Sequence, residues 1–479
     1  MEELIHYVWK HKIFPLEGLT TTDGKRVEVV NPGLHNFDAG PDFFNAKVKV
    51  DGVMWVGNVE IHTNASDWFR HGHDHDKAYD SIILHVVGKA DCEVRRSDGT
   101  SIPQVVLPVP QYVADNYQQL RSADITPRCG RVVSTLSPLV VHSWMSSLYV
   151  ERLEQRTNQI VDRWCQCGKD WEQTLFITLA RNFGFGKNGD AFERWAQSIP
   201  LAAVAKHRDN LLQVEAVFFG QAGLLNDNCP KSAPESRYYH RLQSEYKYLQ
   251  KKFQTTTPLR PMDYTHWLFL RLRPQNFPHI RIAQLAMLYH EGRLNFSKIV
   301  EHANDFSASR FNHDIDKRIG QIGQLRMDFD GFNALFQTHV SDYWQTHYYF
   351  TKEKSEKDGK QERKLSHRLS KSSIDILLIN TISPILFAYG RQKQIEHLTD
   401  TAIDIVEQIS PETNRIIKDW AAFGVIPENA ADSQGLIQLH NEYCIKRNCL
   451  RCRFGYEFIR NTPKLLFEEK ETESGHKIG

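Results

Sequence analysis

Apolar residues in the first 110 positions follow the spacing of one helix and then of several strands. Leu4, Ile5, Val8 and Trp9 share one helical face. Short apolar runs come next, separated by turns that contain glycine. The expected elements are a helix at 2–12, strands at 26–30, 44–50 and 53–62, a partly helical segment at 67–80, a strand at 82–87 and a closing hairpin at 92–107. This order predicts a mixed-sheet α+β domain over residues 1–125.

The pattern changes to long amphipathic helices over residues 126–435, with short polar breaks between them. A cysteine-containing segment at 436–460 follows, which we expect to pack on the rest of the chain. Residues 461–479 have the composition of a frayed tail. The predicted fold class is therefore an N-terminal α+β domain, with a mixed sheet and flanking helices, followed by a large and mainly α-helical region.

Length and composition are those of an ordinary globular protein. The chain has 479 residues, of which 41% are hydrophobic and 24% charged, which is typical of roughly two to four domains. No apolar run approaches the roughly 20 residues of a membrane span, and the acidic start lacks the character of a signal peptide. We therefore expect a cytoplasmic protein. The net charge of +1 does not indicate a nucleic-acid partner, so such binding would need a local basic face.

An acidic pair in the N-terminal domain is the strongest sign of chemistry. Asp42, in Gly40-Pro41-Asp42-Phe43, precedes one predicted strand, and Glu60-Ile61-His62 ends the next. Two carboxylates that meet on neighbouring strands can hold Mg²⁺ or Mn²⁺, which polarises a phosphate and activates water. His62 would serve as a base or as a further ligand. The alternative is that Pro41-Asp42 is a turn and that Glu60 and His62 form an exposed polar stripe.

This element order, with Asp42 and Glu60-x-His62, resembles the PD-(D/E)XK nuclease superfamily. The resemblance implies a restriction-endonuclease-like fold for residues 1–125 and metal-dependent hydrolysis of phosphodiester bonds. The sequence departs from that pattern at one position, because His62 stands where the superfamily has a lysine. Glu3, on the predicted first helix, would supply the additional acid that some members carry there.

Strand register sets a condition on the acidic pair. If Asp51-Gly52 is a two-residue turn, strict alternation turns Asp42 away from the face of Glu60 and puts Lys47 on that face. A bulge near Asn45 would bring Asp42 back. Lys47 is then a candidate for the missing lysine, supplied by the neighbouring strand to stabilise charge on the phosphate.

A histidine-rich run, His71-Gly72-His73-Asp74-His75-Asp76, follows the acidic pair. Histidines at this spacing can bind transition metals. His71 or His73, with Asp76, would then lean over Glu60 and contact a phosphate. The run also supports a different hypothesis, a His/Asp metallohydrolase of small substrates. The alternative is a solvated polar loop, and His85, inside an apolar run, is expected to be a core histidine with satisfied hydrogen bonds.

The last cysteines have the spacing of a metal site, Cys444-x4-Cys449-x2-Cys452. A C-x2-C turn brings two thiolates onto one ion, and the third cysteine adds another. His440 would complete a Cys3His zinc site, whereas Cys129 would make a four-cysteine site for zinc or an iron–sulfur cluster. The alternative is three free thiols.

A stretch of the helical region mixes arginine, aromatic residues and proline. Arg271, Arg273 and Arg281 could line a groove for nucleic acid. The alternative, which the pattern favours, is a crossing between helices in which the arginines cap helix ends.

Nearly the whole chain resembles a bacterial family known only as a domain of unknown function. The matching segments are G-P-D-F at 40–43, V-E-I-H-x4-D-W at 59–68, I-L-H-V-V at 83–87, R-P-x-N-F-P-x-I-R at 273–281 and the cysteine trio. That resemblance implies one evolved unit and supplies no activity. The residues themselves indicate a metal-dependent nuclease of DNA or RNA. A catalytically inactive nucleic-acid- or protein-binding module with the same fold is the alternative.

Overall fold

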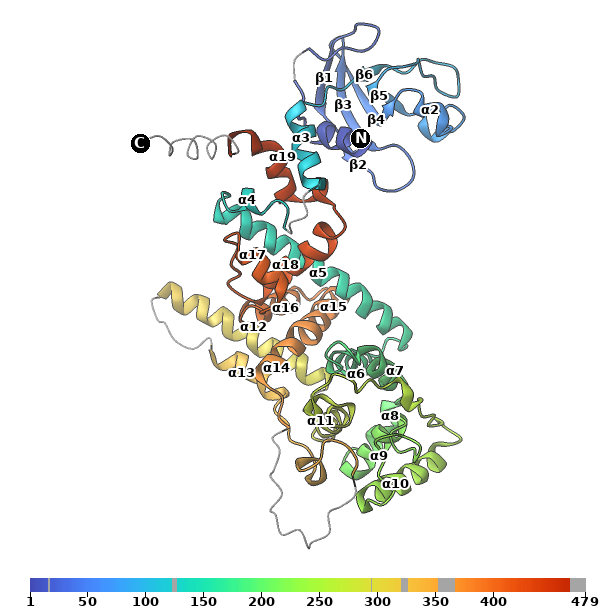
Figure 1. Ribbon diagram of the computed structural model, residues 1–479, viewed down its shortest axis with the longest axis vertical. Coiled ribbons are helices and arrows are strands. Elements are labelled where there is room, and N and C mark those ends of the chain that lie inside the picture. Colours follow the sequence, from blue (N-terminus) through green and yellow to red (C-terminus); the bar gives the residue numbers. More distant parts are fainter. Residues whose placement is uncertain (16–17, 123–126, 294, 320–325, 352–366, 466–479) are drawn as a thin grey trace, which may run out of the picture. The chain divides into compact units, whose positions relative to one another are not determined.

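The chain divides into two compact units (Figure 1). The computed structural model describes residues 1–15, 18–122, 127–293, 295–319, 326–351 and 367–465. Unit 1 comprises Met1–Trp144, Asn414–Ile426 and Leu436–Gly479, and unit 2 comprises Met145–Thr413 and Pro427–Gly435. The C-terminal cysteine segment therefore belongs to the same unit as the N-terminal domain. Of the predicted tail, residues 466–479 lie outside the described residues.

Unit 1 contains a mixed sheet of six strands in the order β1-β3-β4-β5-β6, with β2 beside β3. The β3 strand pairs antiparallel with β1, β2 and β4, whereas β4, β5 and β6 run parallel. The strands are β1 (Val27–Asn31), β2 (Leu34–His35), β3 (Phe43–Val50), β4 (Val53–Asn64), β5 (Ile82–Lys89) and β6 (Gln104–Val106). The prediction of an N-terminal mixed sheet is confirmed.

Helix α1 (Glu2–Lys10) packs against β4 and β5. Acidic residues occupy its first turn and Lys10 its last, which suits the helix dipole. The helix buries the predicted apolar face, Leu4, Ile5, Val8 and Trp9. In β3, buried Ala46, Val48 and Val50 alternate with Lys47 and Lys49, so one face of the strand is apolar.

The predicted closing hairpin at 92–107 is wrong over most of its length. Among the described residues, the turn at Asp98-Gly99 is flanked by the isolated bridge between Arg95 and Ser101. The second half of the segment instead forms β6, which pairs parallel with β5. Val105 is fully buried there. Burial against the existing sheet thus outweighs the local turn signal.

Helices complete unit 1. They are α2 (Asp67–Arg70), α3 (Gln111–Ser122), α4 (Gly130–Val133), α17 (Arg415–Ala421) and α19 (Arg453–Leu465), with short turns η1 (Lys77–Tyr79), η8 (Leu439–Cys444) and η9 (Cys449–Arg451). Helix α19 packs on both α3 and α4 (Figure 1). This contact holds the C-terminal part of the chain against residues that directly follow the sheet. Helices α5 (Pro138–Gln166) and α18 (Ala430–Gln438) contribute residues to both units.

Unit 2 is helical, as the sequence predicts for this region. Its helices are α6 (Trp171–Phe183), α7 (Gly189–Gln197), α8 (Leu201–Val204), α9 (Leu211–Gln221), α10 (Arg237–Phe253), α11 (Pro278–His290), α12 (Phe296–Ile319), α13 (Arg326–Leu335), α14 (Lys371–Leu377), α15 (Ser383–Lys393) and α16 (Glu396–Glu407). One helical stretch of the described chain, Lys371–Lys393, is long and apolar enough to cross a membrane, but 72% of its most apolar window is buried within the fold. Burial of this kind identifies a core helix.

Glu215 is a buried carboxyl in the core of unit 2. It lies on α9 and is 1% exposed. Its carboxylate accepts hydrogen bonds from the hydroxyls of Tyr238, at 2.5 Å, and Ser341, at 2.8 Å. Burial raises the pKa of Glu215 from 4.5 to about 7 despite these two donors.

This shift predicts how the stability of unit 2 changes with pH. The folded state holds a proton that the unfolded state releases, so stability falls as pH rises from 4.5 to about 7 and levels off above. The loss corresponds to about 3 kcal/mol at about 1.4 kcal/mol per pKa unit. Glu215→Gln should remove this decline, raising the apparent Tm above pH 7 by several degrees relative to the parent. Glu301→Gln, at an exposed position of α12, is the control, and an unchanged pH profile in Glu215→Gln would contradict the assignment.

Candidate active site

A bulge in β3 brings the two carboxylates of the acidic pair together. Ala46 lies opposite Gly57, and the next paired residues are Phe43 and Val59, so two residues of β3 face one of β4. Asn45, inside this bulge, has φ +54°, a conformation that asparagine tolerates better than most residues. The extra residue shifts the alternation by one position. The side chain of Asp42 consequently lies on the same face of the sheet as that of Glu60, which is the condition that strand register set.

The carboxylates of Asp42 and Glu60 each accept a hydrogen bond from a backbone N–H at the neighbouring strand. The backbone N–H of Asp42 donates to Oε2 of Glu60 at 3.1 Å, and that of Ile61 donates to Oδ2 of Asp42 at 2.9 Å. Both side chains thus replace ladder hydrogen bonds at the point where the antiparallel pairing ends. Glu60 is 4% exposed, so its charge is held in a largely dry environment.

The two carboxyls have opposite pKa shifts. Burial raises the pKa of Glu60, and the negative charge of Asp42 raises it further against the hydrogen bond from His73. Burial would also raise the pKa of Asp42, but the hydrogen bond and positive charge of His6 outweigh it and lower that pKa. The Nε2 atom of His6 lies 3.2 Å from Oδ2 of Asp42. Separated pKa values in adjacent acids are common at catalytic sites.

Histidines surround Glu60 on its other side. Nε2 of His73 lies 3.3 Å from Oε1 of Glu60, and Nε2 of His62 lies 3.8 Å from the same oxygen. His62 also contacts Nδ1 of His71 at 3.1 Å. The turn that follows α2 carries His71 and His73 over β4. His73 thus lies against Glu60, and His71 lies against His62.

A buried hydrogen-bond chain supports His62 from behind. Its Nδ1 lies 2.8 Å from Nε2 of His85, whose Nδ1 lies 3.2 Å from the side-chain amide of Gln104. Burial, followed by the neighbouring histidines, lowers the pKa values of His62 and His85 to about 3. Both rings are therefore neutral at ordinary pH, which is the form that binds metal ions. His85 is a core histidine with partners, as predicted.

Aromatic side chains fix the position of His73. Its ring stacks on Tyr79 with a centroid separation of 3.7 Å, and it meets the edge of buried Trp68 at 5.3 Å. Trp68 also contacts the rings of His62 and His85. Trp68, six residues after His62 in the chain, therefore builds one wall of the histidine cluster. Such packing limits the rotamers open to a ligand or base.

These donors fit a divalent transition metal. One candidate ligand atom from each of His62, His71 and His73 lies within 4.8 Å of the others, and Glu60 adds an oxygen at 3.3 Å from His73. Mg²⁺ needs near-ideal octahedral oxygen coordination, whereas imidazole nitrogen suits zinc, iron, copper or nickel, and Mn²⁺, as a transition ion, accepts it more readily than Mg²⁺ does. A mixed set of nitrogen and carboxylate ligands therefore favours Mn²⁺ or a related ion over Mg²⁺.

Other predicted residues of the site lie elsewhere. Lys47 pairs with Val56, four residues before Glu60 on β4, and its exposed side chain thus starts roughly 13 Å along the strand. Asp76 caps η1 by accepting from the backbone of Ala78 at 2.9 Å, and it does not join the histidines. The structure therefore brings together Asp42, Glu60, His62, His71 and His73 without Lys47 or Asp76.

The three arginines predicted for nucleic-acid binding are in unit 2. Arg281 is 7% exposed, donates to Asn276 and Gln284, and lies 4.4 Å over the ring of Phe185. It serves the packing of α11 and is not available to a phosphate. Arg271 and Arg273 are exposed at the turn before this helix. Arg281 lies in the first turn of α11 and donates to side-chain amides, so it does not cap the C-terminus of a helix.

A cleft lined by both acidic and basic side chains lies beside Asp42, and the sequence did not reveal it. The cleft has a volume of about 330 Å³. Its lining includes Glu3, His6, Lys10, His35, Asp38, Asp42, Arg447 and Arg451. Glu3, His6 and Lys10 follow one another at helical spacing on α1, a signal that was present in the sequence. Arg447 and Arg451 come from the cysteine segment, some 400 residues away in the chain, so only the folded structure reveals their place.

The four cysteines of the predicted metal site line one small cavity in unit 1. Cys129, Cys444, Cys449 and Cys452 surround it, and His440 is not among the lining residues. Burial, followed by the charges of neighbouring thiols, raises the pKa of Cys444 to about 12 and that of Cys452 to about 11. Cys129 therefore lies with the cysteine trio at this cavity, and His440 does not line it.

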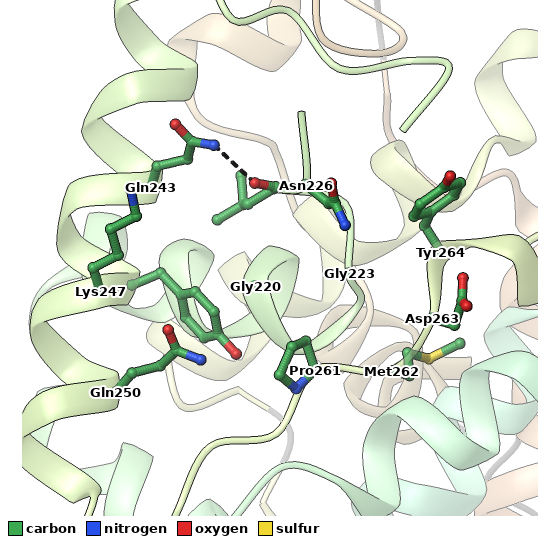
Figure 2. Close-up of a pocket in the computed structure, with 12 residues that line it drawn as sticks. Gly220, Gly223, Asn226, Gln243, Lys247, Gln250, Pro261, Met262, Asp263 and Tyr264 are labelled. Atoms are coloured by element: carbon green, nitrogen blue, oxygen red, sulfur yellow. Dashed lines mark hydrogen bonds between the residues drawn. The ribbon is translucent and has the colours of Figure 1, made fainter. Parts of the chain in front are cut away.

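Unit 2 has a separate hollow of about 490 Å³ (Figure 2). Figure 2 shows Gln243, Lys247 and Gln250 on one side and Pro261 to Tyr264 on the other. Gly223 has φ +70°, and a Cβ there would lie 2.3 Å from the carbonyl of Met262, so the wall admits only glycine. The polar lining consists mainly of amides and lacks a group of neighbouring acids or histidines. It offers less chemistry than the site on the sheet.

The chain belongs to the family described as "Protein of unknown function (DUF2851)", which matches residues 2–415. Neither a search of curated proteins nor one of solved structures finds a match. The family relationship expected from the sequence is therefore confirmed. No relative or solved structure supports the restriction-endonuclease-like fold or the nuclease chemistry, and both stay predictions.

Proposed function

We propose that this protein is a metal-dependent phosphodiesterase that cleaves nucleic acid. One observation supports this above the others: the bulge at Asn45 places Asp42 beside Glu60 at the edge of a cleft that also contains Lys10, Arg447 and Arg451. Two adjacent carboxylates can hold a cation, and the cleft offers positive charge to a phosphate chain. The fold expected for such an enzyme is restriction-endonuclease-like.

Four side chains of the site would hold the cation, and two aromatic side chains would keep the histidines in place. Asp42, Glu60, His62 and His73 would hold the cation. Once bound, the ion supplies Lewis-acid polarisation of the phosphate and lowers the pKa of a coordinated water. A pKa of about 3 makes His62 a weak general base at neutral pH, so its role is that of a ligand. Trp68 and Tyr79 keep the histidine side of the site in place.

Hydrolysis assays with the purified chain test this proposal. Single- and double-stranded DNA and RNA are each incubated with Mn²⁺ or Mg²⁺, and cleavage is measured. We expect cleavage, with faster rates in Mn²⁺ because three of the neighbouring donors are imidazoles. Binding without cleavage under every condition would instead indicate the catalytically inactive binding module. If the protein neither binds nor cleaves any of these nucleic acids, nucleic acid is excluded as the substrate.

The basic side of the cleft predicts a salt-dependent affinity. The double variant Arg447→Ala, Arg451→Ala should weaken binding to single-stranded nucleic acid roughly a hundredfold, because each charged hydrogen bond contributes about 1.5 kcal/mol. The slope of log Kd against log salt should fall by about 0.7 for each lost phosphate contact. Arg415→Ala, at a position 94% exposed on α17, is the matched control. Equal salt slopes in parent and double variant would show that the cleft does not bind phosphate.

A second candidate function is supported by the close approach of His62, His71 and His73. A metal held by these three nitrogens would make the site a hydrolase of small substrates that reach the exposed His71. His71→Ala should then abolish hydrolysis of a small phosphodiester. If cleavage of nucleic acid continues in that variant, the carboxylate pair carries the chemistry.

A further inference from the structure

We propose that Cys129, Cys444, Cys449 and Cys452 bind one metal centre through four thiolates, and that this centre orders the basic wall of the cleft beside Asp42. A zinc ion or an iron–sulfur cluster has the required chemistry. The proposal of a metal site depends only on the four cysteines. Its effect on nucleic-acid binding rests on the proposed function.

The first support is the convergence of four cysteines from two distant segments. Cys129 stands at the start of α4, and the other three lie in the 444–452 segment. All four line the same cavity of about 20 Å³, and none forms a disulfide. The three histidines of the candidate active site are the group of described residues whose ligand atoms already lie within 4.8 Å of one another, so a metal would have to draw the four sulfurs together into a closed four-thiolate site.

Backbone geometry fixes the cysteine positions. Cys452 N–H donates to the carbonyl of Cys449 at 3.2 Å, the tight turn of a C-x2-C pair. Gly455 passes so close that an added Cβ would lie 2.0 Å from the oxygen of Cys449. Arg128, next to Cys129, also lines the cavity and donates to the carbonyl of Cys444 at 3.2 Å. Its positive charge would partly offset the negative charge of several thiolates.

The second support is that the same segment forms the wall of the cleft. Between Cys444 and Cys452, the residues Arg447, Asn448, Leu450 and Arg451 line the cleft that contains Asp42. Arg451 stacks over Phe37 at 4.0 Å from its centroid, and η9 contacts α1. The nine residues from 444 to 452 thus carry cysteines toward one cavity and arginines toward the other. A metal bound by the cysteines would order the 444–452 segment and so fix the positions of Arg447 and Arg451 in the wall of the cleft.

Metal content tests the first part of the proposal. The full chain is purified without oxygen and examined by elemental analysis, sulfide assay and visible absorption. We expect either one zinc per chain or iron with sulfide and cluster absorption. Either metal should be lost in Cys129→Ser and Cys452→Ser and retained in Cys229→Ser, which changes a buried cysteine of unit 2. Absence of both metals from the parent protein, or full retention in Cys129→Ser, would overturn the site.

Trypsin sensitivity and affinity test the second part. Removing the metal from the parent protein with a chelator should speed cleavage after Lys446, Arg447 and Arg451 at least tenfold, whether or not the protein is a nuclease. It should also weaken nucleic-acid binding to the level of the Arg447→Ala, Arg451→Ala variant. Unchanged proteolysis would overturn the ordering of the wall. Faster proteolysis in a protein that never binds nucleic acid would leave the metal site standing and refute only the proposed function. Use of the parent chain avoids reliance on variants that fail to fold.

Discussion

Replacement of either carboxylate, in Asp42→Asn or Glu60→Gln, is expected to lower metal-dependent cleavage by about 10²- to 10⁴-fold. Each change keeps the shape of the side chain and removes a charge that would hold the cation. Loss of several kcal/mol of electrostatic stabilisation in the transition state corresponds to that range. Single-turnover rates with Mn²⁺ are the appropriate measurement, because they report the chemical step and exclude product release.

The control must carry the same change of charge in the same cleft. Asp38→Asn provides it, since Asp38 is exposed and lines the cleft without belonging to the acidic pair. We expect its rate to stay within a factor of about two of the parent, because exposed charges contribute little. Near-UV circular dichroism of all three variants verifies that the aromatic packing persists. A Glu60→Gln protein with the parent rate would refute the proposed catalytic role of the pair.

Local sequence patterns predicted the part of the site that lies on neighbouring strands. The Asp51-Gly52 turn set the register of β3 and β4, so the need for a bulge near Asn45 could be stated from alternation alone. The approach of His73 to Glu60 and of His71 to His62 depends on a short connection after β4. In both cases the interacting residues are within about 30 positions of one another in the chain, where turn geometry restricts the possibilities.

Long-range neighbours could not be predicted in the same way. Arg447 and Arg451 enter the cleft because α19 packs on α3 and α4, and no periodicity in the sequence encodes that contact. The choice between His440 and Cys129 likewise depended on which segment approaches the cysteine trio. The parallel pairing of β6 with β5 replaced a predicted hairpin for a similar reason. Burial against a distant surface decided each of these outcomes, and local propensity did not.

Deletion of Asn45 tests the bulge itself and should abolish cleavage as fully as Asp42→Asn. Without the extra residue, the alternation of β3 runs unbroken and turns Asp42 to the opposite face. The same shift would expose Phe43, which is fully buried, at a cost of about 2 kcal/mol. The variant should therefore show a lower Tm and no measurable affinity for Mn²⁺ at the acidic pair, which titration calorimetry can determine.

Two substitutions at the same position separate the bulge from the asparagine side chain. Asn45→Gly accepts the observed φ of +54° without strain and should keep the parent rate. Asn45→Val places a β-branched residue in that conformation, at a cost of roughly 1–2 kcal/mol, and should reduce both Tm and rate. The expected order of activity is Asn45→Gly, then Asn45→Val, then the deletion, because the rate follows the population of molecules that keep the bulge. A folded deletion variant with the parent rate would show that catalysis does not require Asp42 on the face of Glu60.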